Sequence, residues 1–177
     1  PKDIRALIHM ANEIGIAPTM LKAIDTVNEL QKEVLFSKIN DHFKGKLKGL
    51  VFAIWGLAFK PRTDDIREAP ALVLIDSLLN AGARVQVHDP EAMPNVKALY
   101  GDKITYCNKP YDALQGANAL AIVTEWQEFR NPNFQFMAGI LKENVIFDGR
   151  NLYEPKILSS LGFSYYSIGR KTSFPSS

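Results

Sequence analysis

Two different periods of apolar residues divide the chain into a helical segment and an alternating one. In residues 2–43 the apolar positions recur at helical spacing. The first stripe comprises Ile4, Leu7, Ile8 and Ala11, and Gly15 is expected to end this helix. A second, longer helix is predicted to start near Pro18, with apolar residues mostly three or four apart: Leu21, Ile24, Val27, Leu30, Val34 and Leu35. This second stripe requires burial, against another domain or against a second copy of the chain.

From Leu50 onward, strand-like runs alternate with amphipathic stretches. The strand-like runs are LVFAIWG, RVQVHDP, KITYCN, NALAIVTEW, NVIFDGR and FSYYSIG. The stretches between them contain APALVLIDSLLNAGA, PYDALQGA, NFQFMAGILK and EPKILSSLG, the first with Pro70 near its start and Gly82 past its end. Near-continuous apolar strands alternating with helices indicate a mostly parallel sheet covered on both faces. The sequence therefore predicts an α/β, Rossmann-like fold at residues 49–177, preceded by a long-helix segment at residues 1–48.

Composition excludes several classes of protein. The chain has 177 residues, of which 46% are hydrophobic and 23% charged, as in globular domains. A net charge of +2 is too small to predict binding to nucleic acid or to an anionic membrane. No apolar run approaches the roughly 18 residues that a membrane span needs. A single cysteine, Cys107, excludes an internal disulfide and fits a cytoplasmic protein.

The most specific stretch is FAIWGLAFKPRTDDIREAP, a strand followed by a charged loop and a helix start. A dinucleotide-binding loop needs G-x-G-x-x-G, so that bare backbone can approach a pyrophosphate, yet here Gly56 stands alone. The carboxyl ends of parallel strands share one edge of the sheet, where ligands of such folds bind. Lys60 follows the first strand and Arg150 the fifth, so both are predicted to lie on that edge. Two converging cations suit a diphosphate, which predicts a domain that binds a nucleotide through cationic side chains.

Each of these residues also has a purely structural interpretation. Lys60 alone would be better explained as a solvated loop residue. Arg67 is as well suited to an ion pair with its acidic neighbours Asp64 and Asp65 as to a ligand. Arg150 can cap a helix or pair with an acid. Asp89 occupies the place of a ribose-binding acid, but HDP is also an ordinary turn, and without the glycine loop the turn is favoured.

Other chemically active residues give no site. His9, His42 and His88 share no metal-binding spacing. Cys107 lies in a predicted strand without a neighbouring base, so a buried bystander is favoured over a nucleophile. Trp126 would stack on a base or, more commonly, pack at the rim of the sheet.

Three long motifs resemble one family of enzymes. GLAFKPRTDDIREAPALVLIDSLLNAGARVQVHDP, ALAIVTEWQEFRNPNF and VIFDGRNLY resemble the C-terminal third of the UDP-glucose 6-dehydrogenases. The opening PKDIRAL and the long helix with AIDTVNELQ resemble that family's central helical segment. Dehydrogenases of GDP-mannose and UDP-N-acetylmannosamine share the FK…TDD.RE pattern, whereas TEWQEF with IFDGRNLY is more like the UDP-glucose branch.

The resemblance implies an oxidoreductase whose substrate is UDP-glucose and whose product is UDP-glucuronate. Family members oxidise the primary alcohol twice, reduce two NAD and form a thioester on a catalytic cysteine. That cysteine belongs to a C-F-P-K-D run, and this chain begins within a helix at Pro1, Lys2 and Asp3. The nucleophile and the N-terminal NAD-binding domain are therefore expected to precede these residues, and the chain by itself is predicted to be inactive.

The resemblance also implies roles for six residues. Asp3 matches an aspartate that helps to activate water for thioester hydrolysis, and Lys2 borders the NAD site. Phe59 and Lys60 match a pair that contacts the substrate. Arg67 matches an arginine that reaches towards the NAD phosphates, and Arg150 matches an arginine on the substrate side. No metal is implied.

The resemblance finally implies a homodimer formed through the long helix, although packing on the chain's own domain would give the same pattern. Two alternatives stay open beside the UDP-glucose enzyme. One is a dehydrogenase of another nucleotide sugar, UDP-N-acetylmannosamine or GDP-mannose. The other is a nucleotide-sugar-binding module without chemistry of its own.

Overall fold

The structure is a computed structural model that describes residues 2–175, with the exception of the side chain of Lys2. The chain forms two compact units, Pro1–Val34 and Leu35–Ser177. The first unit contains helix α1 (Lys2–Glu13) and the larger part of α2 (Thr19–His42). Gly15, with φ of 73°, follows α1 as the sequence predicts. The guanidinium of Arg5 on α1 donates to Asp25 of α2 at 3.2 Å, which joins the two helices within this unit.

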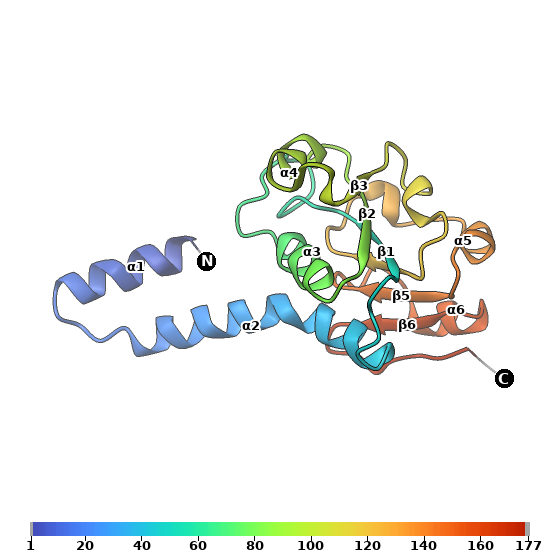
Figure 1. The fold of residues 1–177 in the computed structure, drawn as a ribbon. Coiled ribbons are helices and arrows are strands. Elements are labelled where there is room, and N and C mark those ends of the chain that lie inside the picture. Colours follow the sequence, from blue (N-terminus) through green and yellow to red (C-terminus); the bar gives the residue numbers. More distant parts are fainter. Residues whose placement is uncertain (1, 176–177) are drawn as a thin grey trace. The chain divides into compact units, whose positions relative to one another are not determined.

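The second unit is built on a sheet of six parallel strands in the order β3-β2-β1-β4-β5-β6 (Figure 1). The strands are β1 Val51–Trp55, β2 Arg84–His88, β3 Thr105–Tyr106, β4 Ala119–Ile122, β5 Val145–Asp148 and β6 Ser164–Ser167. The helices are α3 Pro70–Asn80, α4 Met93–Tyr100, α5 Phe134–Ile140 and α6 Pro155–Ser160, with short 3₁₀ turns η1 Gly101–Lys103, η2 Asp112–Leu114 and η3 Gln127–Phe129. The predicted α/β, Rossmann-like fold is confirmed.

Two predicted elements are shorter than expected. The run KITYCN forms only a two-residue strand, Thr105–Tyr106. The stretch PYDALQGA forms the single 3₁₀ turn η2 instead of a helix, because Gly116, with φ of 66°, ends it after one turn. The punctuation of α3 is as predicted, with Pro70 at its first residue and Gly82 just past its end.

The core lies on both faces of β1, because alternate residues of a strand point to opposite sides. On one face the ring of Phe52 meets Phe43, which follows α2, at 5.3 Å between centroids. On the other face Trp55 stacks on Phe129 at 4.9 Å and 22°. Both strand residues are fully buried. The central strand therefore packs against neighbours on each side, as a doubly covered parallel sheet requires.

The last turns of α2 belong to the second unit. Leu35 and Ile39 are buried in its core, and the ring of His42 contacts Phe147 and Tyr166. The compact units therefore divide within α2, whereas the sequence pattern placed the domain boundary after residue 48.

No helix among the described residues is both long enough and apolar enough to cross a bilayer.

His42 makes the stability of the second unit depend on pH. Burial lowers the pKa of His42, although the charge of Glu143 acts in the opposite direction. The folded state therefore binds its proton less readily than the unfolded state, whose histidine titrates near ~6.5. We expect the free energy of unfolding to fall as the pH decreases through that value, measured by urea denaturation between about pH 7.5 and 5. His42→Gln should flatten this slope.

The exposed His9 offers the matched control, because it lies on the surface of α1. In a His9→Gln background, the further substitution His42→Gln should still flatten the slope. Parallel curves for His42→Gln and the unaltered chain would contradict the assignment.

Candidate functional site

The loop after β1 begins with a close approach between two strand ends. Gly56 has φ of 90°, and a Cβ atom there would lie 2.6 Å from the backbone nitrogen of Thr124, just after β4. Only glycine allows this contact and this backbone conformation together. The Thr124 hydroxyl then donates to the carbonyl of Ala58 at 2.6 Å. The single glycine of this loop thus serves the close packing of the ends of β1 and β4.

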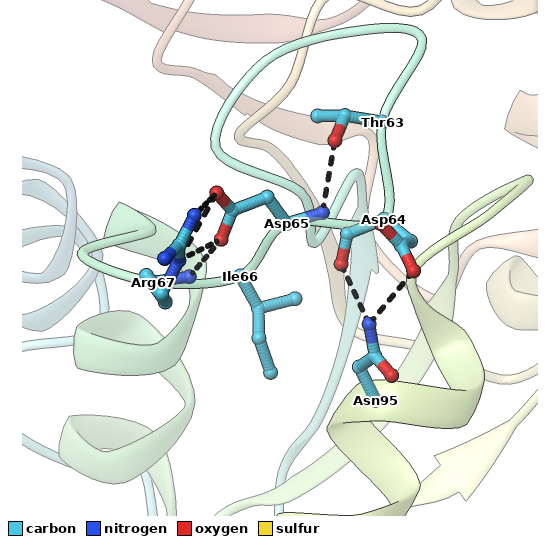
Figure 2. Close-up of a pocket in the computed structure, with 6 residues that line it drawn as sticks. All are labelled: Thr63, Asp64, Asp65, Ile66, Arg67 and Asn95. Carbon is cyan, nitrogen blue, oxygen red and sulfur yellow. Dashed lines mark hydrogen bonds and ion pairs between the residues drawn. The ribbon is translucent and has the colours of Figure 1, made fainter.

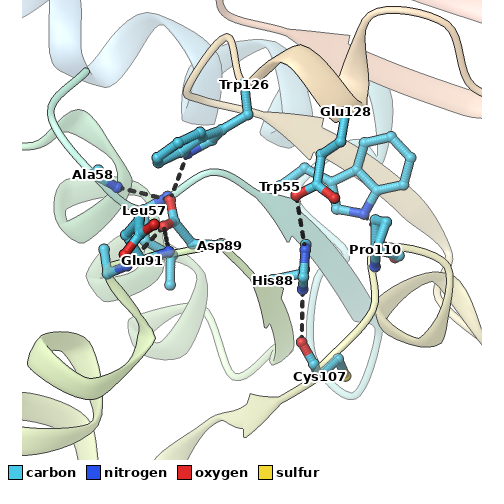
Figure 3. Close-up of polar contacts among 11 residues, drawn as sticks. Trp55, Leu57, Ala58, His88, Asp89, Glu91, Cys107, Pro110, Trp126 and Glu128 are labelled. Atoms are coloured by element: carbon cyan, nitrogen blue, oxygen red, sulfur yellow. Dashed lines mark hydrogen bonds and ion pairs between the residues drawn. The ribbon is translucent and has the colours of Figure 1, made fainter. Parts of the chain in front are cut away.

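The backbone amides that follow β1 are bound by the chain's own Asp89. This carboxylate is fully buried at the end of β2. Its Oδ2 accepts from the amides of Leu57 at 2.7 Å and Ala58 at 3.1 Å (Figure 3). In a dinucleotide-binding fold the amides of this loop would face a pyrophosphate. Here an internal anion takes that place, so these two amides cannot bind a ligand phosphate.

Asp89 also shapes the chain that follows it. Its Oδ1 accepts from the amides of Glu91 at 2.9 Å and Ala92 at 2.7 Å, the pattern of a side-chain turn before α4. The turn interpretation of HDP is therefore confirmed. The buried indole of Trp126 donates to Oδ2 at 3.0 Å, which confirms that this aromatic packs at the rim. One carboxylate accepts five hydrogen bonds and joins the ends of β1, β2 and β4.

Arg150 joins the same edge from the other side. Its Nε donates to the carbonyl of Val123 after β4 at 2.7 Å, and its Nη2 donates to the carbonyl of Phe59 after β1 at 3.3 Å. Glu125 Oε2 lies 3.0 Å from Nε as an ion pair, but it has no hydrogen-bond partner among the described residues because the Nε hydrogen points to Val123. About a third of the Arg150 side chain is exposed, so the guanidinium reaches the surface.

The predicted convergence of Lys60 and Arg150 agrees with this geometry. The guanidinium contacts the carbonyl of Phe59, which forms the peptide bond to Lys60. Lys60 is exposed, and Phe59 is 39% exposed. The backbone of Phe59 and Lys60 therefore meets the guanidinium of Arg150 at the carboxyl edge of the sheet, where both Phe59 and Lys60 are exposed. This arrangement suits an anion carried by a ligand with an aromatic or apolar part.

Arg67 makes an ion pair within its own loop. Its guanidinium donates to both carboxylate oxygens of Asp65, at 2.6 Å from Nη2 to Oδ2 and 2.9 Å from Nε to Oδ1 (Figure 2). The hydrogen bond to Asp65 and the charge of this carboxylate both raise the pKa of Arg67. The side chain is nevertheless 80% exposed. The local pair that the spacing allows is present, and the guanidinium remains accessible.

Arg67 and Asp65 line a polar pocket of about 450 Å³. It is lined by Thr63, Asp64, Asp65, Ile66, Arg67 and Asn95. The amide of Asn95 on α4 donates to the backbone carbonyl of Asp64 at 2.9 Å, so the loop is tied to a helix. Arg62 and Glu68, both with positive φ, flank the turn. These contacts hold the Arg67 loop in one conformation.

A second polar cluster near Asp89 is centred on its neighbour His88. This buried ring bonds through Nδ1 to the Cys107 carbonyl at 2.8 Å and through Nε2 to Glu128 at 3.1 Å. Both partners offer acceptor oxygens, so the ring links the segment after β3 with the 3₁₀ turn η3 (Figure 3). Cys107 itself lies just after β3 and is half-buried, and burial raises the pKa of its thiol. This environment does not favour a nucleophilic thiolate.

The remaining residues implied by the resemblance lie in the first unit. Asp3 is exposed in the first turn of α1. The side chain of Lys2 lies outside the described residues. Both roles remain predictions. Neither the bonds of Asp89 to the β1 loop nor the ion pair of Glu125 with Arg150 could be predicted from the sequence, because these partners lie more than 20 residues apart.

Comparison with known proteins adds an independent line of evidence. Residues 53–155 match the UDP-binding domain of the UDP-glucose/GDP-mannose dehydrogenase family. The UDP-glucose 6-dehydrogenase of Pseudomonas aeruginosa is 47% identical over 96% of this chain and 39% of its own length. UDP-glucose 6-dehydrogenase TuaD of Bacillus subtilis is 36% identical over 96% of this chain and 37% of its length. The chain thus spans about two fifths of these curated relatives.

Solved structures show the same similarity. A UDP-glucose dehydrogenase from the hyperthermophilic archaeon Pyrobaculum islandicum superposes with a TM-score of 0.75 and 34% identity, over 85% of this chain and 33% of that chain. A GDP-mannose dehydrogenase from Pseudomonas aeruginosa, with a TM-score of 0.65 and 21% identity over 84% of this chain and 35% of that one, shares the fold.

The contacts of Asp89 predict a large loss of stability when its carboxylate is removed. Asp89→Ala leaves the buried amides of Leu57, Ala58 and Ala92 without their acceptor. Each unsatisfied buried donor costs about 1–3 kcal/mol, so we expect the free energy of unfolding to fall by at least about 3 kcal/mol in urea denaturation. Asp64→Ala is the control, because this exposed side chain should change stability by only about 0.5 kcal/mol. Similar losses for the two variants would contradict the role of Asp89.

Proposed function

Because this chain belongs to the UDP-glucose/GDP-mannose dehydrogenase family and contains its UDP-binding domain, we propose that it is the C-terminal part of an NAD-dependent UDP-glucose 6-dehydrogenase. The parent enzyme would oxidise UDP-glucose to UDP-glucuronate. The observation that carries this proposal is the convergence of Lys60 and Arg150 at the strand edge of a domain 47% identical to a UDP-glucose 6-dehydrogenase.

The proposed role of this edge is to bind the nucleotide sugar. Lys60 is exposed and directly follows Phe59, whose carbonyl binds the guanidinium of Arg150, and the charges of these two cations suit the two phosphates of UDP-glucose. Arg150 hydrogen-bonds through Nε and Nη2 to backbone carbonyls, so its position is set before a ligand arrives. Such preorganisation lowers the entropic cost of binding. Phe59 would pack against the apolar part of the ligand.

This domain would contribute to NAD binding through Arg67, and not through the loop amides that directly follow β1. The amides of Leu57 and Ala58 are bound by Asp89, so the loop after β1 does not fit a dinucleotide pyrophosphate. NAD would therefore be bound mainly by a part of the protein beyond these residues, consistent with relatives more than twice as long. The exposed guanidinium of Arg67 would contact the cofactor phosphates, with Asp65 orienting it. When bound, NAD accepts the hydride that each oxidation releases.

The proposed chemistry requires groups that this domain does not supply. The half-buried thiol of Cys107 has a raised pKa and is unsuited to form the thioester intermediate. The nucleophile would come from a segment outside these residues, with Asp3 helping to activate the hydrolytic water and Lys2 bordering NAD. The 177 residues alone are therefore expected to release no NADH from UDP-glucose. Measurable NADH formation by them would contradict this division of roles.

A homodimer is proposed to cover the apolar stripe of α2. Three of its residues are more than a third exposed in the single chain: Ile24 at 40%, Val27 at 61% and Leu30 at 61%. Exposed apolar side chains at helical spacing are typical of a helix that packs on a partner. A second copy of the chain would supply the same surface, as a two-fold dimer requires.

Steady-state kinetics of the full-length protein test the proposed ligand roles. Lys60→Ala and Arg150→Ala should each raise KM for UDP-glucose by roughly 10- to 100-fold, the range expected for a lost charge-assisted contact. Arg67→Ala should instead raise KM for NAD. The matched controls are Lys103→Ala and Arg84→Ala, exposed cations at the amino edge of the sheet, which should change neither constant.

The outcomes separate the candidate functions. Unchanged KM values for UDP-glucose in Lys60→Ala and Arg150→Ala would refute the proposed site. Higher kcat/KM for UDP-N-acetylmannosamine or GDP-mannose than for UDP-glucose would leave the site in place and change the substrate. A natural full-length protein without any dehydrogenase activity would favour a binding module.

Sedimentation tests the proposed dimer. The chain should sediment as a dimer, and Leu30→Asp should convert it to a monomer because the charge enters the apolar stripe. Leu99→Asp is the control, since Leu99 is equally exposed but lies on α4. A strict monomer at high concentration would rule out this interface.

A further inference from the structure

The residue after Arg150 has an unusual backbone conformation. Asn151 has φ of 55°, in the left-handed region that residues other than glycine rarely occupy. Asparagine tolerates this region better than most residues, but it still needs surrounding contacts to hold it there. The contacts that hold Asn151 therefore indicate what this turn is for.

The side-chain amide of Asn151 makes two hydrogen bonds to one residue. Its Nδ2 donates to the carbonyl of Ile168 at 3.0 Å, and its Oδ1 accepts from the amide of Ile168 at 2.8 Å. The pairing of β5 with β6 ends at Asp148 and Ser167, one residue earlier. The amide thus binds both backbone groups of the first residue past the ladder, as another strand would. We call this pair of bonds the Asn151 clamp.

The clamp fixes the turn from which Arg150 extends. On one side of the turn, the Arg150 amide donates to Asp148 Oδ1 at 2.8 Å. On the other side stands the Asn151 clamp. Between them the guanidinium reaches Val123 and Phe59 through Nε and Nη2, and Nη1 makes no hydrogen bond to any described residue. The bonds from Nε and Nη2 orient the planar guanidinium, and the backbone turn sets the Cα position from which the side chain reaches them, so both together direct the free Nη1.

We propose that Asn151 is a positioning residue for nucleotide-sugar binding: its clamp on Ile168 holds the turn after β5 so that Nη1 of Arg150 faces the ligand diphosphate. This inference rests on the proposed role of Arg150. It differs from a purely structural role, in which the clamp would only secure the edge strand β6. A positioning role affects the ligand that Arg150 binds and leaves the other substrate unaffected.

Kinetics of the full-length protein distinguish the two roles. Asn151→Gly removes the clamp and still permits the left-handed backbone, whereas Asn151→Ala removes it and adds backbone strain. Both should raise KM for UDP-glucose about tenfold, the size of one lost net hydrogen bond, with KM for NAD and kcat unchanged. Equal effects of the two variants would identify the clamp, and not backbone freedom, as the cause.

A double-mutant cycle with Arg150→Ala supplies the deciding comparison. If Asn151 acts through Arg150, Asn151→Gly should change KM for UDP-glucose little in the Arg150→Ala background. Asn133→Ala is the control, because it removes another side-chain bond to backbone, the 3.0 Å cap of α5 from the Phe136 amide. It should lower the melting temperature and leave both KM values unchanged.

Other outcomes overturn one proposal or the other. The same rise in KM in both backgrounds, or an equal rise in KM for NAD, would reduce Asn151 to a structural role. No effect of Arg150→Ala itself would instead refute the proposed function of that arginine. A failure of the positioning role is thus distinguishable from a failure of the proposed function.

Discussion

The buried carboxylate of Asp89 is the contact on which the ligand-binding edge depends. It accepts hydrogen bonds from the amides of Leu57 and Ala58, the groups that a dinucleotide-binding fold offers to a pyrophosphate. Once an internal anion satisfies these donors, the two amides that directly follow β1 are not available to a phosphate. Recognition of an anion then falls to side chains, and the loop carries Lys60 and Arg67 in place of a glycine series. The absence of the glycine motif and the presence of the buried Asp89 are therefore consistent with each other, because the amides that such a motif would present to a phosphate are bound by Asp89.

The strand ends are joined to one another by three consecutive residues after β4. Thr124 bonds to Ala58, Glu125 pairs with Arg150, and Trp126 donates to Asp89. These contacts link the ends of β1, β2, β4 and β5. Most of the edge is therefore rigid before any ligand binds, and a preorganised cation loses less entropy on binding. Lys60 at the same edge is exposed.

Family membership and geometry support each other at different levels. The match over residues 53–155 identifies the domain as the UDP-binding domain of the family. The contacts of Arg150 and Arg67 indicate how these two cations are oriented within it. The two arginines are held differently. Arg150 is fixed by backbone carbonyls, whereas Arg67 is paired with an acid and remains largely exposed. Arg150 is thus oriented by contacts with the ends of two other strands, whereas Arg67 is oriented by an acid of its own loop.

The sequence by itself determined the elements and the edge on which the site lies. Pro70 and Gly82 marked the ends of α3, and apolar periodicity separated the long helix from the parallel sheet. Because the carboxyl ends of parallel strands share one edge, the sequence predicted that Lys60 and Arg150 lie on the same edge. Only the tertiary structure decided the partner of each polar side chain. Asp89 turned inward to the β1 loop, and Asn151 bound Ile168, because these partners meet only after folding. Periodicity is a local property of a chain, whereas hydrogen-bond partners between distant residues depend on the approach of whole elements.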